Sequence, residues 1–396
     1  MRILRKIVLW TVGIAAVLAL AGFVFYKTQM THHSAAGAEP AAVKPSGDET
    51  LDAIRRGIEF LKVHQEADGE FSAGVLDPKP AFTAMVVDAM LRSPDHYDEG
   101  NPVVARAVQA ILSHRQDDGG IYTPALGLGN YCTSVSVMAL SRLENPAYEP
   151  IIKAARGYIL NAQQPNGGMA YGGSGRADLS NTAMALDALR AAGLDENNDA
   201  FKRAAAFVAL CQNDPETNPE AYAAVVNDGG FIYRPGESKA GEVQGRDGRV
   251  GYKSYGLMSY AGLVSFLWAG VDREDARVKS AYGWVEKNWT LDENVNLKDA
   301  GLYYYYVTMA KALKAYGRRE IKTADGVVHD WPKELAARVV SLQKPDGSWS
   351  NANEKWFEKD PVLVTAYMVR TLSICHEVMN EAPAKAPDKA REKAGS

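Results

Sequence analysis

A glycine-containing turn recurs along the chain at nearly constant spacing, and this repeat constrains the fold more than any other feature. Four copies read HQEADGEF, RQDDGGIY, QQPNGGMAY and LQKPDGSWS, at residues 64–71, 115–122, 163–171 and 342–350. A fifth copy is stretched over residues 210–233. Successive glutamines of the first turns lie 51, 48 and 48 residues apart: Gln65, Gln116, Gln164 and Gln212. Such a period is typical of repeat proteins in which each unit buries its apolar face against its neighbours.

A helix rich in small and apolar residues follows each turn and can be aligned on one Thr or Tyr. The aligned residues are Thr83, Thr133, Thr182, Tyr260, Tyr306 and Thr365. Each such helix is apolar on nearly all sides, whereas the helix before it is amphipathic, which predicts an inner ring of helices wrapped by an outer ring. We place six helical hairpins at residues 51–93, 101–144, 148–194, 200–271, 275–317 and 329–377. The pattern predicts an all-α (α/α)6 toroid, and an open superhelix of helix pairs fits it as well.

The N-terminal residues predict a single-pass membrane anchor in front of the toroid. Residues 7–26 carry no charge and are long enough to cross a hydrocarbon core of ~30 Å. Basic residues precede this run, so we expect a cytoplasmic N-terminus and a toroid on the exported, periplasmic or extracellular, side of the cell membrane. A cleaved signal peptide is the alternative. We assign residues 1–28 to the anchor or signal, 29–50 to a flexible tether, 51–377 to the toroid and 378–396 to a disordered tail.

Composition narrows the function. The chain has 396 residues, of which 46% are hydrophobic and 23% charged, as in ordinary globular proteins. Its formal net charge is −4, and its basic N-terminus is followed by a more acidic body, which argues against nucleic acid as a partner. The three cysteines are widely spaced and form no CxxC motif. We expect no metal and no cofactor.

The turns resemble the repeats of the squalene cyclase and protein prenyltransferase superfamily. The last turn, from Leu342 to Trp349, looks like the QW motif of that family, in which a glutamine caps a helix and a tryptophan stacks on it. QPNGGMAYGG and QDDGGIY are degenerate copies. The resemblance covers residues 51–377. It implies a closed barrel of six inner and six outer helices, whose central cavity, lined by the N-terminal ends of the inner helices, takes an apolar, polyisoprenoid ligand.

The catalytic motifs of the family are only partly present. Proton-initiated cyclases carry DxDDTA, and the aligned string here begins at Asp178 but has Ser180 and Asn181 in place of the other two acids. Asp178 is therefore the candidate catalytic residue, although protonating an alkene requires a strongly tuned carboxylic acid. The prenyltransferases bind zinc through Asp, Cys and His. Cys132 lies at an inner-helix start, but no Asp-x-Cys string and no suitably placed His accompany it.

Further candidate ligand-binding residues lie at the same stage of their repeats, near the starts of the inner helices. They are Asn181, Cys132, Tyr131, Tyr255, Tyr260, Tyr305 and Tyr306. Four successive tyrosines, at 303–306, must span all faces of a helix, so one or two should face the cavity. Their rings could stabilise a cation or simply pack together. The insertion at residues 213–253 could cover the cavity or form a solvated excursion.

Three function classes remain open. The first is a cyclase-like or prenyltransferase-like membrane protein that holds an apolar small molecule or lipid. The second is a non-catalytic tethered binding or scaffolding toroid with a protein partner on its rim. The third is an envelope carbohydrate-active enzyme, which would need paired carboxylates. The carboxylates best placed near inner-helix starts are Asp178, Asp228, Asp247 and Asp360.

Overall fold

The computed structural model describes residues 39–72 and 78–381. Within these ranges the chain forms thirteen α-helices and two short β-hairpins. The predicted membrane segment at residues 7–26 and most of the predicted tail lie outside the described residues.

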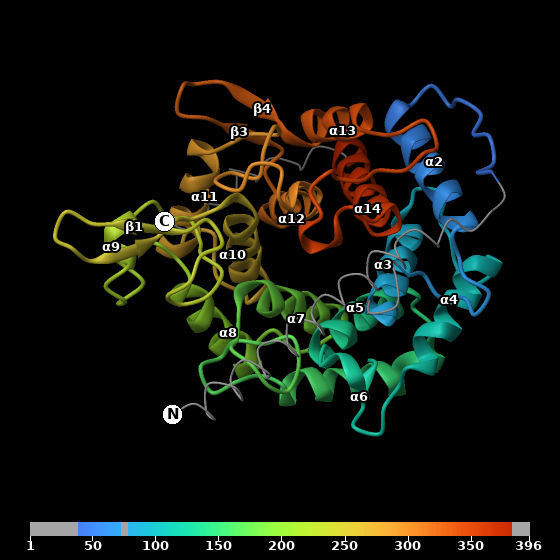
Figure 1. Cartoon of the computed structure of the whole chain (residues 1–396), viewed down its shortest axis with the longest axis horizontal. Coiled ribbons are helices and arrows are strands. Elements are labelled where there is room, and N and C mark those ends of the chain that lie inside the picture. The colour runs from blue at the N-terminus through green and yellow to red at the C-terminus, as the bar shows by residue number, and fades with distance from the viewer. Residues whose placement is uncertain (1–38, 73–77, 382–396) are drawn as a thin grey trace, which may run out of the picture.

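Six helices form a closed inner ring, seen end-on in Figure 1. Each inner helix packs against the next, and the last packs against the first, so the ring is closed and the open superhelix is excluded. The inner helices are α3 (Lys79–Arg92), α5 (Gly129–Arg142), α7 (Leu179–Ala191), α10 (Gly256–Trp268), α12 (Leu302–Tyr316) and α14 (Pro361–Asn380).

Six amphipathic helices wrap this ring. They are α2 (Glu49–Val63), α4 (Pro102–Ser113), α6 (Glu149–Asn161), α8 (Asp199–Leu210), α11 (Ala276–Lys287) and α13 (Trp331–Ser341). The first outer helix, α2, packs against the last inner helix, α14. The prediction of an all-α, α/α toroid is thereby confirmed.

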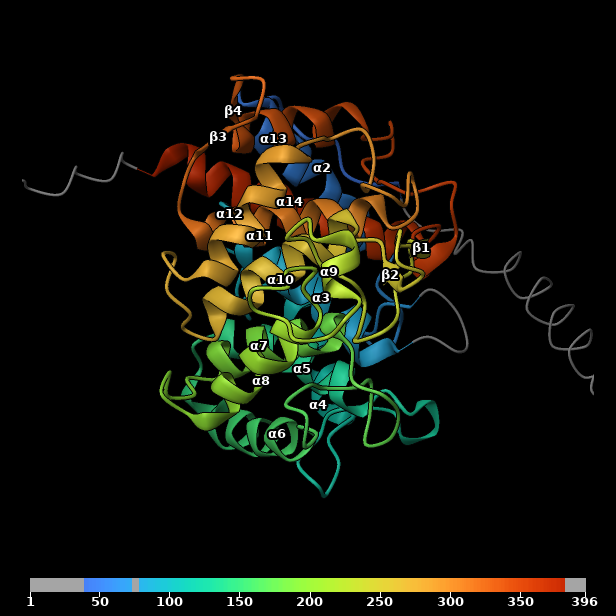
Figure 2. The same ribbon diagram turned by 90° about the vertical axis from the view of Figure 1, so that its left-hand side faces the viewer.

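The inner helices run in one direction, so the ring has two different ends (Figure 2). We call the end at their N-termini, marked by Asp178 and Tyr304, the mouth. The opposite end, marked by Asp88 and Lys311, is the floor. Since helix dipoles add along the axis, the mouth favours negative groups and the floor favours positive ones.

The turn glycines recur because each turn requires both a positive φ angle and close contact with the next outer helix. Gly167 and Gly347 have φ angles of +86° and +87°, which glycine adopts without steric cost. A Cβ at Gly167 would also lie 2.1 Å from the carbonyl oxygen of Arg203, on the next outer helix. At Gly347 it would lie 2.5 Å from the carbonyl oxygen of Arg56. Each turn therefore needs glycine both for its backbone conformation and for close packing.

The turn glutamine ties one repeat to the next. The Gln343 side-chain amide donates to the carbonyl oxygens of Gly347 and Ala53, each at 2.9 Å, and so joins the last repeat to the first. In the third turn the equivalent residue is Gln163, whose amide donates to Gly167 and Ala200. The alignment on Gln164 was thus displaced by one residue. The same holds for Gln116 in the second turn, whose amide donates within its own turn, to His114 and Tyr122.

The aligned threonines have a structural role. The Thr83 hydroxyl accepts a hydrogen bond from the Phe71 backbone N–H at 3.0 Å, and the Thr365 hydroxyl accepts one from Trp349 at 3.1 Å. In the fourth repeat Ser259, rather than the predicted Tyr260, accepts the equivalent bond. With the equivalent bonds to Thr133 and Thr182, these bonds hold five turns against their inner helices.

The remaining elements are short. The antiparallel strands β1 (Glu242–Gln244) and β2 (Val250–Tyr252) form one hairpin, and β3 (Glu320–Lys322) and β4 (Val328–Asp330) form the other. The short helices are η1 (Pro124–Leu126), η2 (Pro146–Tyr148), α9 (Ala223–Val226) and η3 (Lys355–Phe357). Of the helices described, only α14 is long and apolar enough to cross a membrane, and 67% of its apolar window is buried, as suits an inner helix.

Candidate functional site

Asp178 is a buried carboxylate at the mouth. It caps α7, where its Oδ1 accepts from the Asn181 backbone N–H and its Oδ2 accepts from the Asn181 side-chain amide, both at 2.9 Å. Only 1% of the residue is exposed. Burial raises the pKa of Asp178, while hydrogen bonds from Asn181 and Tyr233 oppose the shift. Burial outweighs these hydrogen bonds, so the carboxyl gains a proton more readily than a carboxyl in water.

Tyrosine rings surround this carboxylate. The Tyr304 hydroxyl lies 3.1 Å from the Ser180 hydroxyl, and its ring stacks on Tyr367 with centroids 5.7 Å apart. Tyr131 and Tyr171 face one another at 6.0 Å. Burial raises the pKa of Tyr131, and Tyr304 and Tyr367 contribute to the shift. The mouth is therefore an aromatic layer with a buried acid at one side.

Of the four successive tyrosines, Tyr304 faces the ring axis. The hydroxyls of Tyr305 and Tyr306 instead donate to the carbonyl oxygens of Thr290 and Leu291, in the segment between α11 and α12. Both residues are fully buried, and Tyr260 packs edge-on against Tyr305 at 5.5 Å. Tyr260, Tyr305 and Tyr306, predicted to bind a ligand, form a packed wall between helices rather than the lining of the channel.

The other predicted site residues occupy the margin of the mouth. Tyr255 is buried before α10, and its raised pKa reflects burial first and then Tyr233 and Asp178. Cys132 is buried in α5, where burial raises the pKa of its thiol to about 12, so it stays protonated. The Asn181 side-chain oxygen is buried and accepts no hydrogen bond from the described residues.

A second buried carboxylate, Glu358, was not anticipated. Its Oε1 accepts from the Tyr304 backbone N–H at 2.7 Å, at the start of α12, and its Oε2 accepts from the Asn351 amide at 2.8 Å. The residue is fully buried, and burial raises its pKa to about 7. Tyr304 thus contacts Glu358 through its backbone and Ser180, in the first turn of α7 after Asp178, through its hydroxyl. No repeat motif contains Glu358, so the sequence offered no signal for it.

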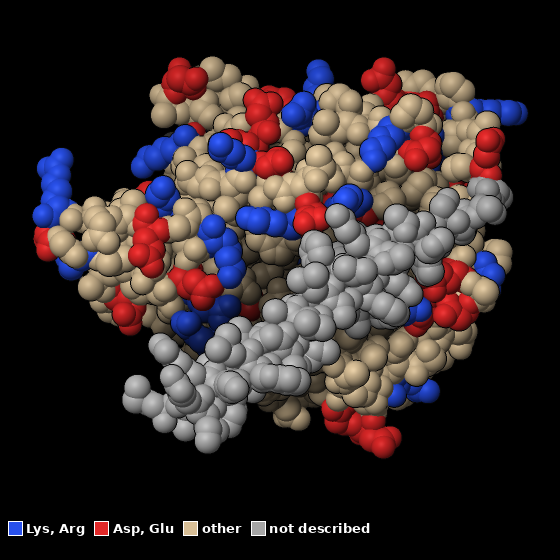
Figure 3. Space-filling view, viewed as in Figure 1, with Lys and Arg blue, Asp and Glu red and all other residues tan. Residues whose placement is uncertain are grey.

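A narrow channel runs from the mouth toward the floor along the ring axis. It is lined by residues of all six inner helices, and its cavity has a volume of about 40 Å³. Tyr304 and Tyr367 lie at one end, Lys311 and Arg370 at the other. The middle is apolar: Met85, Val135, Met138, Ala183, Met184, Ala261, Val264, Val307 and Ala366. Figure 3 shows a hollow near the centre of the mouth face, with basic and acidic side chains along its edge.

The other predicted carboxylates have local partners. Asp228 accepts from the Ser254 hydroxyl at 2.7 Å, and Asp360 caps α14 by accepting from the Leu363 N–H at 2.8 Å. Asp247 lies half exposed in the β1–β2 hairpin, paired with Arg249. None of the three carboxylates lines the channel described above.

The insertion contributes to the rim of the mouth. The Tyr233 carbonyl oxygen accepts from the Leu179 N–H at 2.9 Å, at the first residue of α7. Beside it, the Glu237 carboxylate lies 3.3 Å from Arg234 and 2.7 Å from Lys239. This part of the insertion borders Asp178, whereas the β1–β2 hairpin lies at the periphery of the ring (Figure 1).

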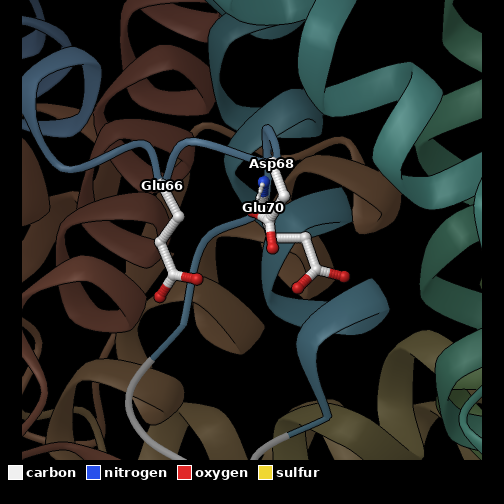
Figure 4. A group of neighbouring side chains, drawn as sticks. All are labelled: Glu66, Asp68 and Glu70. Atoms are coloured by element: carbon white, nitrogen blue, oxygen red, sulfur yellow. Dashed lines mark hydrogen bonds between the residues drawn. The ribbon is translucent and has the colours of Figure 1, made fainter.

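Three carboxylates, Glu66, Asp68 and Glu70, approach one another between α2 and α3 (Figure 4). Their ligand atoms lie within 4.8 Å of one another, as in a metal site. However, the Lys79 ammonium group lies 2.6 Å from Glu70, 3.2 Å from Glu66 and 4.0 Å from Asp68. A lysine therefore already supplies the positive charge that a cation would bring.

Comparison with known proteins gives two family matches. The prenyltransferase alpha-alpha toroid domain matches residues 9–144, and the squalene-hopene cyclase N-terminal domain matches residues 104–210. No curated protein matches the chain significantly.

Solved structures share the fold. The apo type II terpene cyclase MstE from Scytonema is 14% identical with a TM-score of 0.50, and the match covers 83% of this chain and 99% of that one. A variant of MstE in complex with its product, merosterolic acid A, gives a TM-score of 0.51 at 14% identity, covering 83% and 97%. A family 76 glycoside hydrolase (mannosidase), Bt3792 from Bacteroides thetaiotaomicron, gives 0.55 at 12%, covering 84% and 100%. Identities this low show the fold alone.

The closed double ring of helices, with its aromatic and acidic mouth, defines an α/α toroid protein. The family matches, the turn motifs and the terpene cyclase structures agree on its relatives. The chain therefore shares the α/α toroid fold and resembles the terpenoid cyclases and protein prenyltransferases over the residues that the two family models match.

Proposed function

We propose that this protein is a membrane-anchored toroid of the cell envelope that binds an apolar ligand of the polyisoprenoid type, with a polar end of the ligand at the mouth. The observation that carries the proposal is Asp178, a buried carboxyl of raised pKa set among tyrosine rings beside an apolar channel. A mostly apolar pocket with a few convergent polar groups is typical of small-molecule sites.

The relatives support this ligand class. MstE has been solved with geranylgeranyl dihydroxybenzoate as substrate and with merosterolic acid A as product. The first of these joins a long isoprenoid chain to a polar aromatic end. We carry the ligand class to this chain because the fold is shared and because the mouth offers both aromatic faces and a carboxyl.

The channel must widen to admit such a ligand. Its volume of about 40 Å³ is far below the ~300–1,000 Å³ of typical ligand sites. Met85, Met138 and Met184 lie along it, and methionine side chains adapt to new surroundings more easily than branched ones. We therefore expect these three side chains to move when the ligand enters.

Asp178 is the candidate catalytic residue within this proposal. A carboxyl whose pKa is raised holds its proton to a higher pH than an ordinary aspartate and can donate it to a ligand. The Asn181 amide donates to the same carboxyl and favours its charged form. The proposal therefore claims ligand binding first. Proton-initiated cyclisation of the bound ligand is a further claim, which requires Asp178 to act as the acid.

One observation favours the carbohydrate alternative. Asp178 and Glu358 are both buried at the mouth, and burial raises the pKa of both. The mannosidase match has a TM-score of 0.55, and glycoside hydrolysis uses two carboxyl groups. In the scaffolding alternative the channel stays filled by its own side chains and the rim binds a protein.

A titration with geranylgeraniol tests the proposal. We expect saturable quenching of tryptophan fluorescence in the detergent-solubilised protein, because Trp268 lines the channel. Ala366→Phe fills the channel and should weaken binding at least tenfold, about 1.4 kcal/mol. Ala337→Phe, on the exposed face of the outer helix α13, is the matched control and should bind as the wild type does.

Two results would contradict the proposal. Absence of saturable binding would favour the scaffold. Release of reducing sugar from α-mannan oligosaccharides, lost in both Asp178→Asn and Glu358→Gln, would favour the carbohydrate enzyme.

A further inference from the structure

A layer of charged side chains closes the floor of the channel, and the proposed function does not use it. We call this set the floor layer: Asp88, Arg92, Arg142, Asp187, Lys311 and Arg370. The Asp88 carboxylate lies 3.1 Å from a nitrogen of each of the three arginines. The Asp187 carboxylate lies 2.7 Å from Lys311 Nζ and 3.5 Å from Arg370 Nη2. The layer draws on five of the six inner helices.

The floor layer carries more positive than negative charge, since two acids face four cations. Its centre is largely removed from water: the exposed side-chain fractions are 2% for Asp88, 11% for Arg370 and 16% for Lys311, whereas Arg92 (18%) and Arg142 (36%) reach the solvent at its edge. Burying a charge costs free energy unless it is paired. Burial lowers the pKa of Lys311 to about 8. The charged form of Lys311 is therefore less favourable in this layer than in water.

The helix dipoles offset only part of the excess positive charge of the floor layer. The inner helices end at the floor, where their carbonyl groups present partial negative charge. Yet Arg92 and Arg142 direct their hydrogen bonds to Asp88. Arg370 Nε is buried and has no hydrogen-bond partner anywhere in the described part of the chain. A bound water could satisfy this donor, but it would add no negative charge to Asp88 and Asp187, which Arg370 shares with the other cations of the layer.

The unpartnered donor belongs to a side chain that lines the channel. Arg370 and Lys311 both border the cavity of about 40 Å³, and Lys311 is held over the Trp268 ring, 4.8 Å from its centroid. A cavity needs roughly 10–15 Å³ by this measure to hold one water. The cavity is therefore large enough for a small polar group. At its floor end the two side chains that border it, Lys311 and Arg370, are both cations.

We propose that the floor layer binds one oxyanion group, a carboxylate or a phosphate, where Lys311 and Arg370 border the channel, so that it shares these two cations with Asp187. Hydrogen bonds from charged donors to such oxygens are short and strong, and guanidinium groups match their geometry. The group could be a free anion or the anionic end of an amphiphile whose chain fills the channel. The site is independent of Asp178, so it can exist whether or not the proposed function is correct.

The test is thermal unfolding of the detergent-solubilised full-length protein in sodium phosphate and in sodium chloride of equal ionic strength. A specific site should raise Tm by about 4 °C at a phosphate concentration of 100 times Kd, relative to chloride. Lys311→Met should lose this shift. Lys314→Met is the matched control, because Lys314 lies on the same helix but pairs with Glu377 outside the layer, and it should keep the shift.

Hexyl phosphate separates the two sources of the anion. An amphiphile site should bind it at least tenfold more tightly than inorganic phosphate, and Ala366→Phe should abolish this gain while leaving the phosphate shift. A free-anion site should bind both alike.

The proposal fails if phosphate and hexyl phosphate stabilise the wild type no more than chloride does. It also fails if Lys311→Met keeps the full phosphate shift. Lys311→Gln supplies a second neutral variant if the methionine disturbs folding. Neither failure bears on geranylgeraniol binding, so the two proposals remain distinguishable.

Discussion

The mouth and the floor of the inner ring each bury two carboxylates. The two pairs differ in their neighbours, and their pKa values shift in opposite directions. At the mouth, Asp178 and Glu358 face mostly amides, hydroxyls and backbone N–H groups, and burial raises the pKa of both. At the floor, burial also acts to raise the pKa of Asp88 and Asp187, but neighbouring arginine and lysine groups outweigh it and hold both pKa values below the ordinary range.

The difference shows that burial alone does not determine what a carboxylate can do. A carboxyl that is buried with few charged neighbours keeps its proton to a higher pH than one in water. A carboxylate among cations stays charged, and it leaves those cations unpaired if it is lost. The mouth is therefore suited to binding and proton transfer, whereas the floor provides fixed charge.

The largest expected effect is the loss of a floor carboxylate. Asp88→Asn leaves three arginines without their shared partner. We expect the free energy of unfolding to fall by about 3–5 kcal/mol, as when one partner of a buried ion pair is removed. Urea denaturation measures this change.

The matched variant at the mouth is Asp178→Asn. Asparagine also caps helices well, so we expect a loss below about 1 kcal/mol. Equal losses for the two variants would break the comparison between mouth and floor.

The second prediction concerns Glu358 and pH. Its folded pKa of about 7 exceeds the ordinary value near 4.3, so the folded state favours the protonated form. The resulting stabilisation is present below about pH 4.5 and is lost as pH rises to about 7, by up to about 3 kcal/mol. Glutamine does not titrate there. The difference in unfolding free energy between wild type and Glu358→Gln should therefore change across this range, and a constant difference would show that Glu358 is not buried as described.

Much of the fold was predictable because each turn needs particular residues for its own backbone conformation and for its contact with the next helix. A glycine with a left-handed backbone that also touches the next helix, as at Gly167 and Gly347, must recur wherever the repeat recurs. The glutamine that joins neighbouring repeats recurs in most turns for the same reason, although the predicted register was displaced by one residue at Gln116 and at Gln164. The period of the turn motif in the sequence is therefore enough to predict a ring of helical hairpins.

The site was less predictable because it depends on ring closure. Helical spacing places Tyr304, Tyr305 and Tyr306 on different faces but does not say which face meets the axis. Glu358 lies in a loop where Trp356 and Phe357 adopt positive φ angles of 55° and 63°, outside every repeat motif. The floor layer joins residues from five helices, so no sequence interval relates them.

A third, smaller prediction sharpens the assignment of the tyrosines. Tyr305→Phe removes the donor to the Thr290 carbonyl and should cost about 1–2 kcal/mol of unfolding free energy. Tyr304→Phe should cost less, because its hydroxyl borders the channel, where water can replace the Ser180 contact. Only Tyr304→Phe should alter geranylgeraniol affinity. The reverse pattern would place Tyr305, rather than Tyr304, in the binding surface.

The central claim is that the mouth and channel hold an apolar ligand, and the most direct measurement is mass spectrometry of an organic extract of the purified full-length protein. We predict an apolar compound at near-stoichiometric level in the wild type and in Ala337→Phe, and its loss in Ala366→Phe, where the channel is filled. An extract without such a compound, or one retained equally by Ala366→Phe, would contradict the account.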